Sequence, residues 1–234
     1  MGEGSENSLQ EMKLLTTITT AFLLSMQFCQ AQTVCIDPGH PSEVGKGTHG
    51  KKITEIHAAW KVAILLKKEL EDEGIKVVMT KGNEMQYVKN KDRALTANKV
   101  KADLMVRLHC DSEAGTGFAV YIPKKKGKAQ GKTGPSDTVL QACAKVGPIF
   151  HKELVAGLNG KLKDNGLQPD TQTAVGGKYG ALIGSIFSEV PVVLIEMCRL
   201  SNKNDEAFIS SEKGQSAMAK ALAKATLKVV RPNK

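Results

Sequence analysis

Short apolar runs with strand character alternate along this chain with longer segments in which apolar residues recur at helical spacing. Runs of about four to eight residues rich in β-branched side chains are typical of buried strands, and apolar residues at roughly every third or fourth position are typical of amphipathic helices. We expect strands over residues 33–36, 75–79, 104–108, 117–122 and 192–195. We expect helices over residues 54–73, 87–100, 137–163 and 205–229.

This alternation predicts the α/β fold class, with a mostly parallel sheet and helices on both of its faces. The chain has 234 residues, of which 41% are hydrophobic, so it can bury one sizeable core but is short for two large domains. We therefore expect a single domain over residues 32–234. Residues 39–50 are expected to form a glycine-rich loop, and residues 176–184 form a second glycine-rich stretch.

The first 31 residues are expected to lie outside this domain. Lys13 precedes an apolar run over residues 14–28 and a short cleavage context at residues 29–31, which together are typical of a secretory signal peptide. The run is interrupted by threonines and is shorter than the ~20 apolar residues of a membrane span, so an uncleaved anchor is less favoured. Residues 1–11 are polar and acidic, which indicates an upstream extension with Met12 as the true start. We expect an exported protein of the periplasm or cell envelope, without stable membrane insertion after cleavage.

The chain that remains after cleavage is distinctly basic. Residues 1–31 hold one Lys and three Glu, so the remainder carries 32 basic and 21 acidic residues, a formal charge of +11. In an exported protein this balance favours anionic envelope polymers or lipid headgroups as partners over nucleic acid. The alternative is that scattered lysines only keep the surface soluble. The one concentrated basic segment, residues 124–132, is expected to be a flexible surface loop.

Four cysteines remain after cleavage, at positions 35, 110, 143 and 198. Their spacing contains no CxxC pair, which argues against a structural zinc knuckle. In an oxidising compartment up to two disulfides could form, in any of three pairings that the sequence does not rank. The alternative, which we favour, is that all four are small buried hydrophobic residues.

Polar side chains able to bind a metal stand at the ends of the expected elements. His40 and His109 each follow an apolar strand run, Glu196 ends the run over residues 192–195, and Glu55 stands in the first turn of a helix. Because an α/β sheet places its active site at the carboxyl edge of the strands, we expect these four side chains to lie near one another. Each has an ordinary explanation when taken singly, such as a helix-dipole contact for Glu55 or an ion pair with Arg199 for Glu196. Their convergence favours a site.

Catalytic zinc takes three protein ligands from His, Glu or Asp and keeps a fourth position for water. His40, Glu55 and His109 supply such a set, and Glu196 could then act as the base. Glu43, His49 and His57 also lie near the first histidine. We keep Glu55, because His57 points to another side of the helix and His49 lies in a glycine context. The chain contains no His-Glu-x-x-His, Gly-x-Ser-x-Gly or P-loop motif that would indicate a competing chemistry.

The order and spacing of these segments resemble the zinc-dependent N-acetylmuramoyl-L-alanine amidases of the amidase_3 type. The resemblance covers residues 33–230 and rests on four segments, namely Asp37-Pro38-Gly39-His40, Glu55, residues 102–109 and residues 191–202. It implies a catalytic amidase domain over residues 32–234, one zinc ion on His40, Glu55 and His109, and a catalytic Glu196. It further implies hydrolysis of the amide between N-acetylmuramic acid and L-alanine of peptidoglycan, in cell-wall remodelling or daughter-cell separation. We expect a monomer whose partner is its peptidoglycan substrate.

The resemblance also assigns secondary positions and exposes departures. Arg93, Asn98 and Asn202 match family residues that we interpret as structural or substrate-shaping, with Asn202 a candidate for substrate binding. Arg107 replaces the small residue usual two positions before the second histidine, so it either narrows the site or reaches for a stem-peptide carboxylate. No long insert follows residue 122, where some relatives carry an occluding helix, and we therefore expect a site that is open without an activator.

Two other interpretations remain open. The protein could be a metal-dependent amidase or peptidase that acts on another cell-wall amide, such as a cross-link or a recycled muropeptide. It could also be a non-catalytic peptidoglycan-binding relative that has kept the fold, although the presence of all four key residues argues against this.

Overall fold

The computed structural model describes residues 32–232 and contains one six-stranded sheet in the order β2-β1-β3-β8-β4-β7. The expected extension and signal peptide over residues 1–31 lie outside the described residues. Pairing is parallel across β2-β1-β3-β8 and between β4 and β7, whereas β4 runs antiparallel to β8. The strands are β1 (Thr33–Pro38), β2 (Lys76–Met79), β3 (Leu104–Asp111), β4 (Phe118–Ile122), β7 (Asp164–Pro169) and β8 (Val192–Arg199). The predicted α/β class with a mostly parallel sheet is confirmed.

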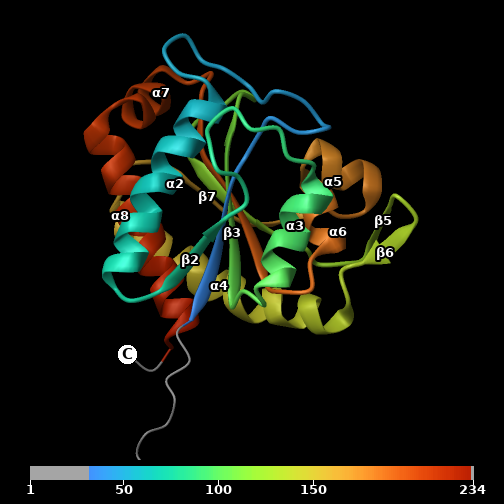
Figure 1. Cartoon of the computed structure of the whole chain (residues 1–234). Helices are drawn as coiled ribbons and strands as arrows, with labels where there is room; N and C mark the ends of the chain where they lie inside the picture. Colours follow the sequence, from blue (N-terminus) through green and yellow to red (C-terminus); the bar gives the residue numbers. More distant parts are fainter. Residues whose placement is uncertain (1–31, 233–234) are drawn as a thin grey trace, which may run out of the picture. The chain divides into compact units, whose positions relative to one another are not determined.

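Helices cover both faces of this sheet, as Figure 1 shows. On one face, α2 and α8 pack side by side and α8 also packs on α4. The helices of this face are α2 (Glu55–Asp72), α4 (Asp137–Leu158) and α8 (Glu212–Val230), with α7 (Lys203–Ser210) beside them. The other face carries α3 (Asn90–Lys99), α5 (Ala174–Tyr179) and α6 (Ile183–Phe187), and a short 3-10 turn η1 (Asp170–Gln172) precedes α5. None of the described helices is long and apolar enough to cross a membrane.

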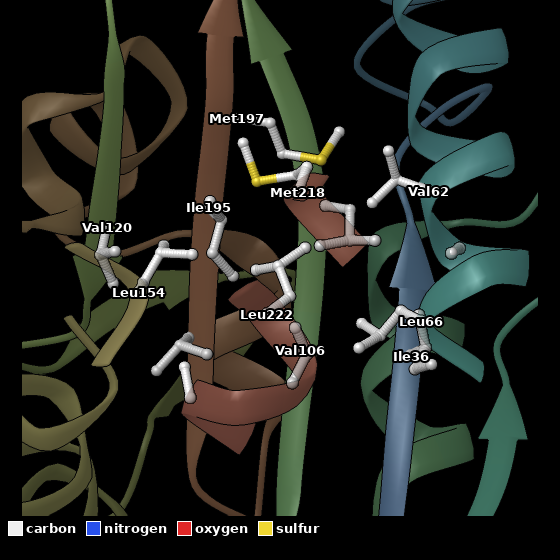
Figure 2. Packing of buried hydrophobic residues seen from close by; sticks show 14 of the residues in the cluster. Ile36, Val62, Leu66, Val106, Val120, Leu154, Ile195, Met197, Met218 and Leu222 are labelled. Carbon is white, nitrogen blue, oxygen red and sulfur yellow. The ribbon is translucent and has the colours of Figure 1, made fainter. Parts of the chain in front are cut away.

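The core lies between the sheet and the α2–α8 layer. Helix α2 begins where Thr54 accepts a hydrogen bond from the His57 amide, and its apolar positions at helical spacing then face the strands. Figure 2 shows Val62 and Leu66 of α2 and Leu222 of α8 directed toward strand side chains. Because side chains alternate along a strand, every second residue of β1 and β3 points to the opposite face of the sheet, away from α2 and α8. That second face holds the polar chemistry described below.

A two-stranded hairpin occupies the basic segment for which we expected a flexible loop. Strands β5 (Gly127–Ala129) and β6 (Lys132–Gly134) pair antiparallel, and Ala129 joins a small apolar cluster with α3 and α6 residues. Gly127 packs so closely on the main chain of Tyr179 and Ala181 that a Cβ there would lie 2.5 Å from it. The loop prediction was wrong because the hairpin packs on the protein through small residues such as Gly127 and Ala129, and small residues give no apolar periodicity in the sequence.

Other boundaries also differ from the sequence prediction. Helix α3 begins at Asn90 instead of residue 87, and α4 ends at Leu158 because Asn159 adopts a left-handed conformation with φ 46°. The expected closing helix is two helices, since Ser211 ends α7 and caps α8 through a hydrogen bond from the Gly214 amide. Strand β7 and the short helices of the second glycine-rich stretch were not predicted at all.

All four described cysteines are buried free thiols, in line with the favoured interpretation. Cys110 and Cys198 come from adjacent strands, and their sulfur atoms lie 3.7 Å apart. Burial raises the pKa of Cys143 to about 11, which keeps that thiol protonated at neutral pH.

Candidate metal centre

The candidate site forms at the carboxyl ends of the central parallel strands, the place expected for an α/β sheet. His40 follows β1 by two residues, whereas His109 lies within β3 and stands in register with Glu196 of β8. Glu55 is the first residue of α2. The sheet therefore brings together four residues that are spread over most of the chain, as the sequence predicted.

Three of these side chains form a compact set of metal-competent atoms. One ligand atom from each of His40, Glu55 and His109 lies within 4.8 Å of the others. Glu55 Oε1 is 2.9 Å from His109 Nδ1 and 3.5 Å from His40 Nε2, and the two imidazole rings meet edge to face with centroids 5.1 Å apart. The predicted triad is thus a real cluster.

Main-chain groups orient the triad from outside. His40 Nδ1 lies 3.0 Å from the Gly45 carbonyl, which leaves Nε2 directed at Glu55. The amides of Thr48 and Cys110 donate to the two oxygens of Glu55, at 2.8 and 3.2 Å. Contacts of this kind hold candidate ligand side chains in one orientation.

Two glycines leave room for the rings and the carboxylate. A Cβ on Gly39 would lie 2.5 Å from His109 Cε1, and one on Gly47 would lie 2.8 Å from Glu55 Oε2. Gly47 also has φ +77°, a conformation that side-chain-bearing residues rarely adopt. The main chain therefore approaches the triad more closely than any residue with a side chain would allow.

Two buried polar atoms at this site have no hydrogen-bond partner among the described residues, namely His109 Nε2 and Glu196 Oε2. Buried polar groups are nearly always paired in native proteins, so each such atom calls for an explanation. Two imidazoles and one carboxylate are a donor set that zinc takes in catalytic sites, and the ligand atoms of His40, Glu55 and His109 lie close enough together to share one cation. The residues present fit a zinc ion.

The electrostatics of the site separate the two glutamates. Burial opposes the ionisation of Glu55, but the hydrogen bond from His109 and the nearby imidazoles hold its pKa below the ordinary value. Burial and the charges of Glu55 and Asp111 raise the pKa of Glu196 well above the ordinary value. Burial also lowers the pKa of His109, which favours the neutral imidazole that a metal needs. Glu55 is thus suited to ligation and Glu196 to carrying a proton.

A cavity of about 240 Å³ opens beside these residues. All four predicted residues line it, and the rest of its wall comes from the loop before α2, from the turn and helices before β8, and from β3, α3 and β8. Wall residues include Thr173, Val175, Leu182, Ile183, Asp111 and Leu194. A substrate that enters this cavity reaches the triad and Glu196 together.

Comparison with known proteins decides the family. The family model described as N-acetylmuramoyl-L-alanine amidase (Amidase_3) matches residues 34–228. The chain belongs to this family. The resemblance noted from the sequence motifs is confirmed.

Among curated members of the family, the sporulation-specific N-acetylmuramoyl-L-alanine amidase of Bacillus subtilis is 35% identical over 95 residues, which are 38% of this chain and 35% of that protein. The probable cell wall amidase LytH of Staphylococcus epidermidis is 26% identical over 204 residues, 85% of this chain and 58% of that protein. The chain thus spans between about a third and three fifths of these relatives. A solved N-acetylmuramoyl-L-alanine amidase from Clostridium difficile 630 superposes with a TM-score of 0.69 at 25% identity, over 87% of this chain and 99% of that one.

Arg107 lies at the cavity but is largely engaged by the protein. Its Nε donates to Asp37 Oδ2 at 2.8 Å and its Nη2 donates to Asn90 Oδ1 at 2.6 Å, on a side chain that is 2% exposed. Its Nη1 donates no hydrogen bond to the described residues and packs against Gly184. Substrate binding by Arg107 stays a prediction. Of its guanidinium nitrogens, only Nη1 is free to contact a substrate.

Asn202 is not among the described residues that line the cavity. Its Oδ1 accepts hydrogen bonds from the amides of Asn204 and Asp205 and so caps α7, while its Nδ2 donates to the Gly115 carbonyl at 3.1 Å. Asn98 likewise holds main-chain groups of Phe187 and Glu189 at the end of α6. These contacts agree with a structural role, and substrate binding by Asn202 stays a prediction.

A buried ion cluster beneath the site was missed as a unit by the sequence analysis. Asp37 accepts hydrogen bonds from Arg93, Arg107 and Thr80, and Lys81 lies buried beside this cluster. The sequence signals were separate, because Asp37 stood within the first motif while Arg93 and Arg107 were noted only at positions of the family pattern. Lys81 gave no signal, because a lysine that follows a strand run ordinarily marks a solvent-exposed end. Buried pairing of this kind becomes visible only once α3 is folded onto β1.

Proposed function

We propose that this chain is a zinc-dependent N-acetylmuramoyl-L-alanine amidase that hydrolyses the amide between N-acetylmuramic acid and L-alanine in peptidoglycan. The observation that carries the proposal is the triad of His40, Glu55 and His109, with atoms within 4.8 Å, beside the unpaired buried oxygen of Glu196. Membership of the family supplies the substrate class. We further propose a role in cell-wall remodelling or daughter-cell separation, since the LytH relative is named a probable cell wall amidase.

The chemistry follows from the residues at the cavity. His40, Glu55 and His109 would hold one zinc ion, which when bound supplies a Lewis acid for the scissile carbonyl and acidifies water. Glu196 then accepts a proton from the attacking water at its unpaired oxygen and delivers it to the leaving alanine nitrogen. The raised pKa of Glu196 suits this cycle, because it makes the carboxylate a stronger base toward the attacking water.

Zinc binding and bond specificity are tested together on purified residues 32–234. We expect one zinc per chain by metal analysis, loss of dye release from labelled peptidoglycan on chelation, and recovery on adding zinc. Mass spectrometry of the products should show stem peptides with a free L-alanine amine and glycans with an intact lactyl acid. Products cut at a cross-link would support a different amidase or peptidase, and binding without release would support a non-catalytic relative.

Arg107 is proposed to select substrates through Nη1, by pairing with a stem-peptide carboxylate. We expect wild type to prefer muropeptides with free stem carboxylates over amidated ones. Arg107→Gln should lose this preference through a higher KM for the free acid. An unchanged preference in the variant would remove Arg107 from the substrate site.

We also propose that the protein is exported and acts as a monomer in the periplasm or envelope, with an open site. The purified chain alone should then release dye without an added protein. Strict dependence on a partner would overturn the proposal of an open site.

A further inference from the structure

Four consecutive main-chain carbonyls around the first metal-site histidine are held by two buried cations. Arg93 donates to the carbonyls of Pro38 and Pro41, at 2.7 and 3.0 Å. Lys81 Nζ donates to the carbonyl of His40 at 2.5 Å and reaches that of Gly39 at 3.4 Å. The main chain of residues 38–41 is therefore held in place by hydrogen bonds from these two side chains.

This segment needs an external hold because it leaves the sheet at this point. Its last contact with the sheet is the hydrogen bond from the Gly39 amide to the Leu108 carbonyl, at 2.8 Å. His40 then takes a left-handed conformation with φ 47°, which is unfavourable for a residue with a side chain. Such a conformation persists only where its surroundings determine it, and here the surroundings are the two cations.

The cations are themselves anchored, so they can act as fixed points. Arg93 is 1% exposed, pairs with Asp37 Oδ1 at 2.7 Å and donates through Nε to the Val88 carbonyl at 3.0 Å. Lys81 is 2% exposed, donates to the Glu84 carbonyl at 2.8 Å and lies 5.7 Å from the ring of Trp60.

We infer that Lys81 and Arg93 are positioning residues that hold the main chain of residues 38–41 so that His40 Nε2 faces Glu55, and that they thereby set the metal affinity of the site. The inference rests on the proposed zinc site. Without Lys81, the carbonyls of Gly39 and His40 lose a donor, and the His40 main chain is free to relax toward an ordinary conformation. The imidazole then swings away from Glu55, and part of the binding free energy is spent on bringing it back.

The test measures zinc affinity by competition with a chromogenic chelator in wild type and in Lys81→Met. We expect a dissociation constant about ten- to a hundredfold higher in the variant, the range seen when groups that orient metal ligands are removed. Lys81→Arg, which keeps a charged donor, should recover most of the affinity. Lys61→Met, at an exposed lysine of α2, is the matched control and should bind zinc as wild type does.

Thermal unfolding of the metal-free proteins separates positioning from general stability. The fluorescence of Trp60, the only tryptophan of the chain, reports whether the site of Lys81 has changed. A lower melting temperature with unchanged zinc affinity in Lys81→Met would show a purely structural role and overturn the inference. If Lys81→Met does not fold, Arg93→Lys replaces it, because it keeps a charge beside Asp37 but cannot span Pro38 and Pro41.

The two proposals fail in different ways. Zinc binding by wild type with equal binding by the variant would remove the positioning role alone. A wild-type chain that binds no zinc would remove the proposed metal site and the positioning role with it.

Discussion

Two buried polar clusters lie side by side at the same end of the sheet, and they differ in how completely their atoms are paired. In the first, Asp37 lies between Arg93 and Arg107, and each of its oxygens accepts a charged hydrogen bond. In the second, the triad and Glu196 leave His109 Nε2 and Glu196 Oε2 buried without partners. Both clusters draw on β1 and β3, but the first is completed by Arg93 of α3 and the second by Glu55 of α2 and Glu196 of β8.

The comparison shows how a structural charge cluster is told from a functional one. A buried carboxylate whose two oxygens are both paired, as in Asp37, ties its partners together, although such a pair contributes little net stability over a hydrophobic alternative. A cluster with unpaired atoms is unfavourable unless something else binds there. The first cluster therefore serves the second, by fixing the segment that carries His40.

The largest effect is expected at Glu196, where one substitution should lower activity and raise the stability of the metal-free protein. Glu196→Gln should lower amidase activity by about 10²–10⁴-fold, because it removes the proton carrier. The raised pKa of Glu196 means that its ionisation opposes folding, so wild-type stability from this residue falls as pH rises from about 4 toward neutrality. The variant lacks that decline, and its metal-free form should melt higher than wild type at neutral pH. Dye release and thermal unfolding check the two parts, with Glu73→Gln on the surface as control.

Asp37→Asn should have the largest effect on stability, because it leaves two guanidinium groups buried without their counter-charge. We expect a loss of about 3–5 kcal/mol in the free energy of unfolding, measured by urea denaturation of the metal-free protein. Burial opposes the ionisation of Asp37, but the two arginines and Thr80 hold its pKa well below the ordinary range. Its stabilisation is therefore present above the ordinary aspartate pKa and is lost as pH falls, so the variant and wild type should converge in acid. A neutral-pH difference below about 1 kcal/mol would contradict the assignment.

Gly39→Ala should weaken the metal site with little effect on the ion cluster. A Cβ at this position would lie 2.5 Å from His109 Cε1, so the imidazole must move. We expect zinc affinity to fall by about tenfold or more, in line with the loss of ligand orientation. Gly82→Ala is the matched control, since the nearest atom to its Cβ would be Gln86 Oε1 at an ordinary 3.6 Å. Equal affinities in the two variants would show that the triad tolerates displacement of His109.

The smallest effect is expected for an ion pair on the solvent-exposed surface of the protein. Lys68 and Asp72 lie one helical turn apart on the exposed face of α2. Because solvent screens such pairs, Lys68→Ala should change neither the melting temperature nor dye release measurably. A clear loss of stability would mean that pairing without burial is enough to stabilise the protein, and that burial does not set the ion cluster apart from the charged surface.

The sequence by itself determined the local features of this protein. Strands β1, β2, β3 and β8 and helix α2 were predicted within a few residues, because apolar periodicity and capping are properties of short segments. His40, Glu55, His109 and Glu196 were found for a related reason, since each ends or begins such a segment and parallel strands bring their ends to one edge.

Only the tertiary structure decided which groups pair across that edge. The antiparallel direction of β4, the β5–β6 hairpin and the edge strand β7 depend on partners distant in the chain, and their own residues carry little periodic signal. The same holds for Arg107 against Asp37 and for Lys81 beneath His40. A charged side chain has the same local pattern whether it points to water or into the protein, and only packed neighbours determine whether burial is compensated.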